Sequence, residues 1–184
     1  MRIISGKFKK TNLYLPKKIN FRPTSDFIKE GLFSSIQNIV NDSIFLDLFS
    51  GSGSIGLEAL SRGANIVYFV DINYSSIKIL EKNLKLVDIS PENYTITKKD
   101  FKKALFDFYN KKIKFDIIFA DPPYNKGFLE KIIENVEKLD ILKEKGILII
   151  EHSKRENFNS DIKELVLYKI LEYGDTRLSF FKRR

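Results

Sequence analysis

Apolar residues recur along the chain at two spacings, one typical of buried strands and one typical of amphipathic helices. Short runs of consecutive apolar residues predict strands at 44–46, 66–70, 115–120 and 147–150, with a weaker strand at 94–97. Apolar residues three or four positions apart predict helices whose buried faces span 28–39, 57–60, 77–87, 101–109 and 129–136. The chain thus alternates between strands and helices from its first third onward.

Strands that alternate with helices, and that are apolar on both faces, predict a parallel sheet covered by helices on both sides. The end of the chain differs, because strand-like segments at 165–171 and 177–181 flank a turn at 172–176 and predict an antiparallel edge. The expected fold class is therefore α/β. We divide the chain into a basic N-terminal extension with short strands, residues 1–23, and one α/β domain, residues 24–184.

The composition removes several classes of protein from consideration. The chain has 184 residues, 43% of them hydrophobic, which suits one domain with a proper core. It has no cysteine and one histidine, which excludes disulfides, iron–sulfur clusters, cysteine nucleophiles and multi-histidine metal sites, so no metal is expected. No apolar stretch approaches the roughly 20 residues that span a bilayer, and the N-terminus lacks the apolar core of a signal peptide. We expect no membrane association and a cytoplasmic location.

The net charge of +8 is concentrated at the N-terminus. Residues 1–25 hold seven basic residues and no acidic one, whereas the rest of the chain is nearly neutral. Such a cluster fits a polyanionic partner, and on charge alone it fits a solubilising arm equally well.

Four aspartates follow four successive predicted strands: Asp47, Asp71, Asp100 and Asp121. Functional residues of parallel α/β sheets lie beyond the carboxyl ends of the strands, so we expect these aspartates around one site. The run Gly-Ser-Gly-Ser-Ile-Gly at 51–56 follows the first strand, and its glycines permit a tight turn and close approach of a ligand. Alone, this motif also fits a plain strand–helix turn.

Asp47 bears on which ligand the glycine loop holds. A carboxylate there repels the pyrophosphate of a dinucleotide, whereas S-adenosylmethionine carries an ammonium and a sulfonium and no phosphate. Asp71 is placed to accept hydrogen bonds from ribose hydroxyls and Asp100 from the adenine amino group, with Phe101 or Ile72 packing on the adenine. Helix capping is the structural alternative for Asp71 and Asp100.

The run Asp-Leu-Phe-Ser-Gly-Ser-Gly at 47–53 resembles motif I of class I methyltransferases. The resemblance implies a Rossmann-like, mostly parallel sheet of seven strands with an antiparallel C-terminal hairpin. Within the motif, Asp47, Phe49, Gly51 and Gly53 are the candidate residues for binding S-adenosylmethionine.

An Asp-Pro-Pro-Tyr run at 121–124 follows the strand predicted at 115–120. Consecutive prolines end the strand and stiffen the loop, so the flanking Asp121 and Tyr124 are held in place. The run suits methylation of a planar amino group: the Asp121 carboxylate and the Pro122 carbonyl accept its two N–H bonds, and Tyr124 stacks on the ring. These three are the candidate catalytic residues. The same tetrad marks enzymes acting on adenine N6, on glutamine and on guanine N2.

Further segments narrow the substrate. Residues 1–7, 22–26, 151–153 and 173–180 closely resemble the RsmD-type 16S rRNA guanine-N2 methyltransferases, and the resemblance runs from residue 1 to about 181. It implies methylation of the exocyclic amine of one guanine in 16S rRNA, within a partly assembled 30S particle.

The candidate RNA contacts are Lys7, Lys9, Lys10, Arg22, Thr24 and Arg177. The lysines are expected to make salt-sensitive contacts to the RNA backbone, and Arg22 to bind a phosphate at the start of the next helix. For Arg177, an internal salt bridge to Asp175 is as reasonable as RNA contact. His152 invites interpretation as a general base, but ordering a loop after the fifth strand is favoured.

Two other functions stay open. Adenine-N6 methylation of DNA is disfavoured because such enzymes usually carry a target-recognition domain, for which the chain leaves no room. A non-catalytic RNA-binding assembly factor on the same scaffold is disfavoured by the intact Asp47 and Asp121. A monomer is expected, since no long apolar patch demands a partner.

Overall fold

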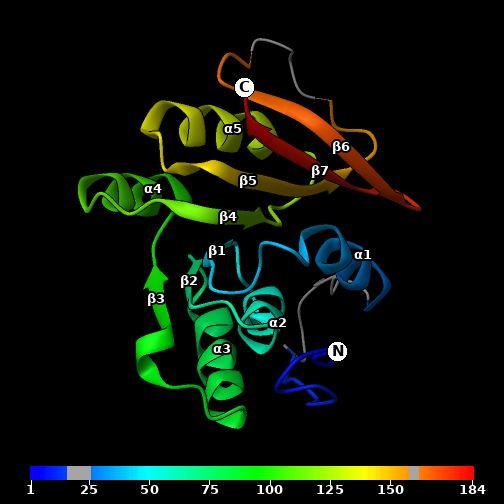
Figure 1. The fold of residues 1–184 in the computed structure, drawn as a ribbon, viewed down its shortest axis with the longest axis vertical. Coiled ribbons are helices and arrows are strands. Elements are labelled where there is room, and N and C mark those ends of the chain that lie inside the picture. Colours follow the sequence, from blue (N-terminus) through cyan, green and yellow to red (C-terminus); the bar gives the residue numbers. More distant parts are fainter. Residues whose placement is uncertain (16–25, 158–161) are drawn as a thin grey trace.

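The computed structural model describes residues 1–15, 26–157 and 162–184, which include one seven-stranded sheet with helices on both faces (Figure 1). The helices are α1 (Asp26–Ile36), α2 (Ser54–Ser61), α3 (Tyr74–Leu86), α4 (Phe101–Asn110), α5 (Phe128–Leu139) and the short 3-10 helix η1 (Pro91–Asn93). The strands are β1 (Ile44–Leu48), β2 (Ile66–Asp71), β3 (Tyr94–Lys98), β4 (Phe115–Ala120), β5 (Leu142–Ser153), β6 (Leu165–Tyr173) and β7 (Thr176–Arg183).

The strands lie in the order β3-β2-β1-β4-β5-β7-β6. The first five are parallel, and β7 pairs antiparallel with both β5 and β6. The predicted α/β class, with a mostly parallel sheet and an antiparallel C-terminal hairpin, is confirmed. The strand order reverses between β1 and β4, and in such sheets the loops after these two strands separate and leave a crevice at the carboxyl edge.

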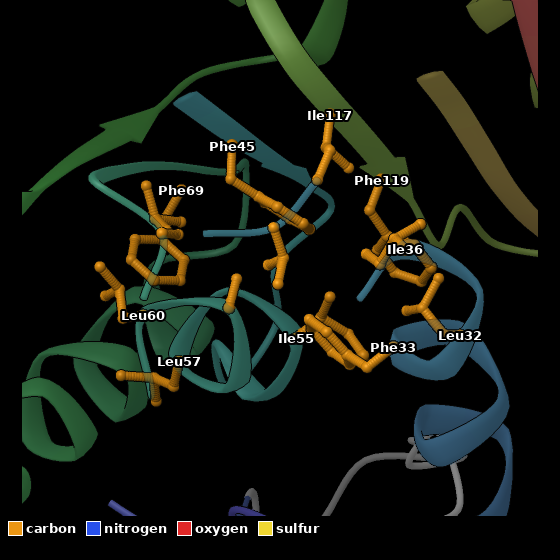
Figure 2. Close-up of a cluster of buried hydrophobic side chains, with 14 of the residues drawn as sticks. Leu32, Phe33, Ile36, Phe45, Ile55, Leu57, Leu60, Phe69, Ile117 and Phe119 are labelled. Carbon is orange, nitrogen blue, oxygen red and sulfur yellow. The ribbon is translucent and has the colours of Figure 1, made fainter. Parts of the chain in front are cut away.

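The alternation of side chains along each strand divides the core into two layers. Helices α1, α2 and α3 pack with Phe45 of β1 and Phe69 of β2 on one face. Figure 2 shows the labelled side chains of α1 and α2 gathered on the same side of the strands as these two rings. Helices α4 and α5 pack with Leu46 and Leu48 of β1 on the other face. Across the described residues, no helix combines the length and apolar composition needed to cross a bilayer.

Strand β5 is longer than its apolar run predicts, because it begins at Leu142 and continues to Ser153. Its first residue, Leu142, pairs with Phe115 of β4, and a register irregularity that contains the polar residues 143–145 follows before Ile147 pairs with Ile117. The periodicity does not reveal this irregularity. The prediction that His152 follows this strand is therefore wrong. His152 lies inside β5, where its Nε2 is 2.8 Å from Ser179 Oγ of β7, and burial lowers its pKa.

The N-terminal segment, residues 1–15, packs on α2 and α3. Glu58 of α2 accepts hydrogen bonds from the backbone N–H groups of Ile4 (2.7 Å) and Ser5 (3.0 Å). The same carboxylate lies 3.4 Å from Lys29 Nζ of α1, and both side chains are fully buried. The predicted extension thus packs on the domain as far as residue 15, and its remainder lies outside the described residues.

Candidate functional site

A pocket of about 550 Å³ opens at the carboxyl edge of β1, β2 and β4. It is lined by Met1, Asp47, Phe49, Ser50, Gly51, Ser52, Ser54, Ile55, Asp71, Ile72, Asn73, Ser76, Phe119, Asp121, Pro122, Pro123 and Tyr124. The glycine loop and the Asp-Pro-Pro-Tyr run, more than sixty positions apart in the sequence, therefore share one cavity. Gly53, Asp100 and Phe101 are not among the lining residues.

The glycine loop turns sharply between β1 and α2 because three of its residues adopt left-handed backbone angles. Phe49, Gly51 and Gly53 have φ angles of 65°, 54° and 79°. A side chain at Gly53 would also place its Cβ 2.3 Å from Leu80 Cδ1 of α3. Gly53 therefore shapes the loop from behind, while Gly51 and Phe49 face the cavity.

Asp47, the penultimate residue of β1, lies inside the protein, with 2% of its surface exposed. Its Oδ2 accepts a hydrogen bond from the Gly56 N–H of α2 at 2.9 Å. Burial raises the pKa of this carboxyl to about 7, and the nearby charge of Asp71 adds to the effect. A cation bound in the pocket would favour the ionised form of Asp47.

Asp71 fastens the end of β2 to the glycine loop. One carboxylate oxygen accepts from the Gly51 N–H at 2.8 Å, and the other accepts from the Asn73 N–H at 2.7 Å. The side chain that caps α3 is Asn73, which accepts from the Ser75 N–H, so helix capping does not explain Asp71. Each carboxylate oxygen keeps lone-pair capacity for a ligand hydroxyl.

Asp100 and its neighbour Phe101 lie differently from the first two aspartates. Asp100 caps α4 by accepting from the Lys102 N–H at 2.9 Å, which confirms the structural alternative for this residue. Phe101 is 4% exposed, and its ring contacts Phe49 and Phe128 with centroids 5.4 and 5.8 Å away. It supports the pocket wall through Phe49, whereas Ile72 lines the cavity and is 68% exposed.

Three serine side chains of the glycine loop indicate that the pocket is built for a polar ligand. The Oγ atoms of Ser50, Ser52 and Ser54 are buried, and none has a hydrogen-bond partner among the described residues. All three residues line the cavity. Buried polar atoms without partners are costly, so a ligand with donors and acceptors fits this loop.

The Asp-Pro-Pro-Tyr run forms the opposite wall. The Tyr124 hydroxyl donates a hydrogen bond to Glu151 Oε1 of β5 at 2.8 Å, which anchors the ring. Burial, together with the charge of Glu151, raises the pKa of Tyr124, so the phenol stays protonated. Sequence reasoning noted Glu151 as part of a family segment but did not connect it with Tyr124.

Asn83 of α3 is a further residue that sequence reasoning missed. It is fully buried, and its Nδ2 donates to the backbone oxygens of Ser52 at 2.9 Å and Tyr14 at 3.1 Å. Its Oδ1 accepts from the Tyr14 N–H at 2.8 Å. One side chain thus holds the glycine loop and the N-terminal segment together. A polar residue on the apolar face predicted at 77–87 was the available signal.

The candidate RNA contacts that lie within the described residues, Lys7, Lys9, Lys10 and Arg177, do not line the pocket. Arg2 and Asn12 form an antiparallel bridge, and the exposed Lys7, Lys9 and Lys10 lie in the segment between them. Arg22 and Thr24 lie outside the described residues. Arg177 donates from Nε to Glu172 Oε1 at 2.8 Å. The ion pair of Arg177 is thus made with Glu172 across the hairpin, and the suggested pairing with Asp175 is corrected.

Within residues 1–15, 26–157 and 162–184, no group of three or more histidine or acidic side chains is placed to hold a metal ion.

Comparison with known proteins places this chain in a family. The family model described as "Conserved hypothetical protein 95" matches residues 1–182. YlbH of Bacillus subtilis is 32% identical over the whole of both chains. "Ribosomal RNA small subunit methyltransferase D" of Escherichia coli is 32% identical over 157 residues, covering 85% of this chain and 76% of its own. The chain belongs to the RsmD-type methyltransferase family.

The fold agrees with that membership. The solved structure of yhhF from Escherichia coli superimposes with a TM-score of 0.85 at 27% identity, covering 100% of this chain and 98% of that one. The two chains therefore share one fold over nearly their whole length, and the family match confirms the RsmD-type resemblance expected from the sequence.

Proposed function

We propose that this protein transfers a methyl group from S-adenosylmethionine to the exocyclic N2 amine of one guanine in 16S rRNA of an assembling small ribosomal subunit. The observation that carries the proposal is the shared cavity: Asp47 and Asp71 line one wall, and Asp121 and Tyr124 line the other. The printed name of the Escherichia coli relative, which specifies small-subunit rRNA, supports the substrate class. A cytoplasmic location follows as part of the proposal.

The residues of the first wall suit the cofactor's groups. The buried Asp47 carboxylate supplies negative charge toward an ammonium, and Asp71 supplies acceptors for ribose hydroxyls. Ile72 offers an exposed apolar surface to the adenine, and the partnerless serine hydroxyls of the glycine loop supply further polar contacts. When bound, S-adenosylmethionine supplies a methyl group activated by its sulfonium.

The residues of the second wall suit an amino group attached to a flat ring. Asp121 and the carbonyl of Pro122 accept hydrogen bonds from the two N–H groups of the guanine amine. These hydrogen bonds favour a pyramidal amine nitrogen and free its lone pair. In this proposal the Tyr124 ring, which lines the pocket and is anchored by Glu151, stacks on the guanine and aligns it. These residues act by positioning and by fixed charge, which need no separate strong base.

A methylation assay with labelled S-adenosylmethionine and unmodified 16S rRNA or 30S particles tests the proposal. Asp121→Asn keeps the size of the side chain but removes its charge, and we expect it to lower kcat by about 100- to 1,000-fold. Asp88→Asn is the matched control, because Asp88 is exposed, lies outside the pocket and adopts a left-handed backbone (φ 49°) that asparagine tolerates.

The alternatives predict other results. Label on adenine supports adenine-N6 methylation, and label on protein removes the rRNA substrate altogether. Full methyl transfer by Asp121→Asn, with reduced rRNA affinity, supports a binding role for Asp121 and contradicts the proposed chemistry.

A further inference from the structure

Two aromatic side chains from distant parts of the chain meet at the N-terminal end of α1: Phe27, which is exposed, and Tyr173, which is half-buried. Phe27, in the first turn of α1, is 69% exposed. Its ring meets Tyr173, the last residue of β6, edge to face with centroids 5.2 Å apart. Neither residue belongs to the pocket, and the packing of the core does not require so large an exposed apolar ring at Phe27.

The helix is shaped to receive the tyrosine. Gly31 lies one turn after Phe27, and a Cβ there would come within 1.6 Å of the Tyr173 hydroxyl. Only a residue without a side chain allows the tyrosine to lie this close to the helix. Lys169 of β6 also donates to Ser35 Oγ of α1 at 2.7 Å, so the hairpin is fixed against the helix along its length. Tyr173 of the aromatic pair (Phe27 and Tyr173) therefore packs directly against α1.

The aromatic pair lies between residues that lead to both sides of the pocket. On one side, Arg2 forms an ion pair with Asp26 at 3.3 Å, next to Phe27, and Met1 lines the cavity. On the other side, the turn after Tyr173 leads into β7, which pairs with the end of β5 that carries Glu151, the partner of Tyr124. Figure 1 shows α1 and the turn of the β6–β7 hairpin on the side toward which the arrow of β4 points.

Cations border the aromatic pair. Arg2 stands beside Phe27 with a side chain that is 60% exposed. Near Tyr173, Lys154 and Arg177 share one carboxylate, Glu172, at 2.9 and 2.8 Å. Arg2, Lys154 and Arg177 thus place cationic groups beside an exposed aromatic ring, the combination that binds unpaired nucleotides.

We propose that Phe27 and Tyr173 form a stacking surface for an unpaired RNA base close to the nucleotide that enters the pocket. The proposal rests on the proposed function, because it assigns this surface to the same RNA substrate. Extruding one base from a folded RNA leaves its neighbours unstacked, and an aromatic side chain at the pocket rim replaces the lost stacking. Flanking Arg2, Lys154 and Arg177 contact the adjoining phosphates.

The test compares side chains at position 27 that are all apolar but differ in whether they carry a flat ring. Phe27→Leu keeps an apolar side chain but removes the flat ring, and Phe27→Trp keeps a ring. Phe106→Leu is the matched control, because Phe106 is 54% exposed on α4, contacts Tyr109 with ring centroids 6.4 Å apart, and does not line the pocket. For each protein, the Kd for unmodified 16S rRNA, the Kd for S-adenosylmethionine and the melting temperature are measured at one salt concentration.

We expect Phe27→Leu to weaken rRNA binding by about 5- to 150-fold, the range for loss of one stacked base. Phe27→Trp and Phe106→Leu should bind rRNA as the wild type does, and cofactor affinity should be unchanged in all three. Equal rRNA affinity for Phe27→Leu and Phe106→Leu overturns the proposal, as does an equal loss for Phe27→Leu and Phe27→Trp. If Phe27→Leu fails to fold, Tyr173→Leu against Tyr173→Phe provides the same comparison.

The outcome is separable from that of the proposed function. Ring-dependent rRNA binding without methyl transfer supports the stacking surface and contradicts the methyltransferase assignment. Methylation of guanine with rRNA binding that does not depend on the Phe27 ring supports the methyltransferase assignment and contradicts the stacking surface.

Discussion

Replacing Asp47 with asparagine tests how a buried carboxylate controls cofactor binding. The substitution keeps an oxygen that accepts from the Gly56 N–H and removes the charge. Burial raises the pKa of Asp47 to about 7. The wild-type carboxyl is then ionised in about a tenth of the molecules at pH 6 and about nine tenths at pH 8. If the cationic cofactor binds the ionised form, wild-type affinity rises about tenfold over this range relative to the variant.

Isothermal titration of both proteins with S-adenosylmethionine at pH 6, 7 and 8 measures this effect. The cofactor's own titration is common to both proteins, so it cancels in the ratio of their affinities. Near pH 7, wild-type binding should also release protons, seen as a dependence of the heat on the ionisation enthalpy of the buffer. A ratio that stays flat or falls with pH refutes the account of Asp47.

The same pKa predicts the opposite effect on the cofactor-free protein. Asp47 ionises near its ordinary 3.8 in the unfolded chain and near 7 in the folded one. Its contribution to stability is complete below 3.8 and is lost as the pH rises through 7. The charged form therefore costs up to about 4 kcal/mol at pH 8, and Asp47→Asn should raise the melting temperature there. Unchanged or lowered stability of the variant at pH 8 contradicts this.

Three further predictions concern the buried ion pair, the glycine loop and the lysines proposed to bind RNA. Glu58→Gln leaves Lys29 buried without its anionic partner and should lower the free energy of unfolding in urea by about 3–5 kcal/mol; a loss below 1 kcal/mol contradicts the buried pair. Gly53→Ala strains the glycine loop and should weaken both S-adenosylmethionine binding and the stability of the protein. A variant with the cofactor Kd and the melting temperature of the wild type would contradict the role given to Gly53. Replacing the exposed lysines of the N-terminal segment with glutamine should weaken rRNA binding and flatten its salt dependence, with cofactor affinity unchanged; an equal loss of cofactor affinity contradicts that separation. The replaced lysines are Lys7, Lys9 and Lys10.

The fold could be predicted from the sequence where the signal is local. Parallel strands buried on both faces leave apolar runs, and β1, β2 and β4 were found from theirs. The first residues of β5 were not predicted because Lys143, Glu144 and Lys145 are polar. They lie between two pairings with β4, that of Leu142 with Phe115 and that of Ile147 with Ile117. Pairing between distant segments leaves no periodic trace in the sequence.

For the candidate site too, the features with a local sequence signal could be predicted and those that depend on long-range contacts could not. Functional residues of parallel sheets lie beyond the carboxyl ends of the strands, and from this rule Asp47, Asp71 and Asp121 could be predicted to share a site. All three line one cavity. The supports of the site are long-range contacts: Asn83 joins the glycine loop to Tyr14. The suggested pairing of Arg177 with Asp175 failed for a related reason, since hairpin register places Glu172 opposite Arg177.

The central claim is that the pocket methylates the N2 amine of a guanine in 16S rRNA. Incubating the protein with isotopically labelled S-adenosylmethionine and unmodified 30S particles, then digesting the RNA and separating its nucleosides by mass spectrometry, tests it directly. We predict label in N2-methylguanosine at a single position of 16S rRNA. Label in N6-methyladenosine, in another guanosine derivative or in ribosomal protein would contradict the account.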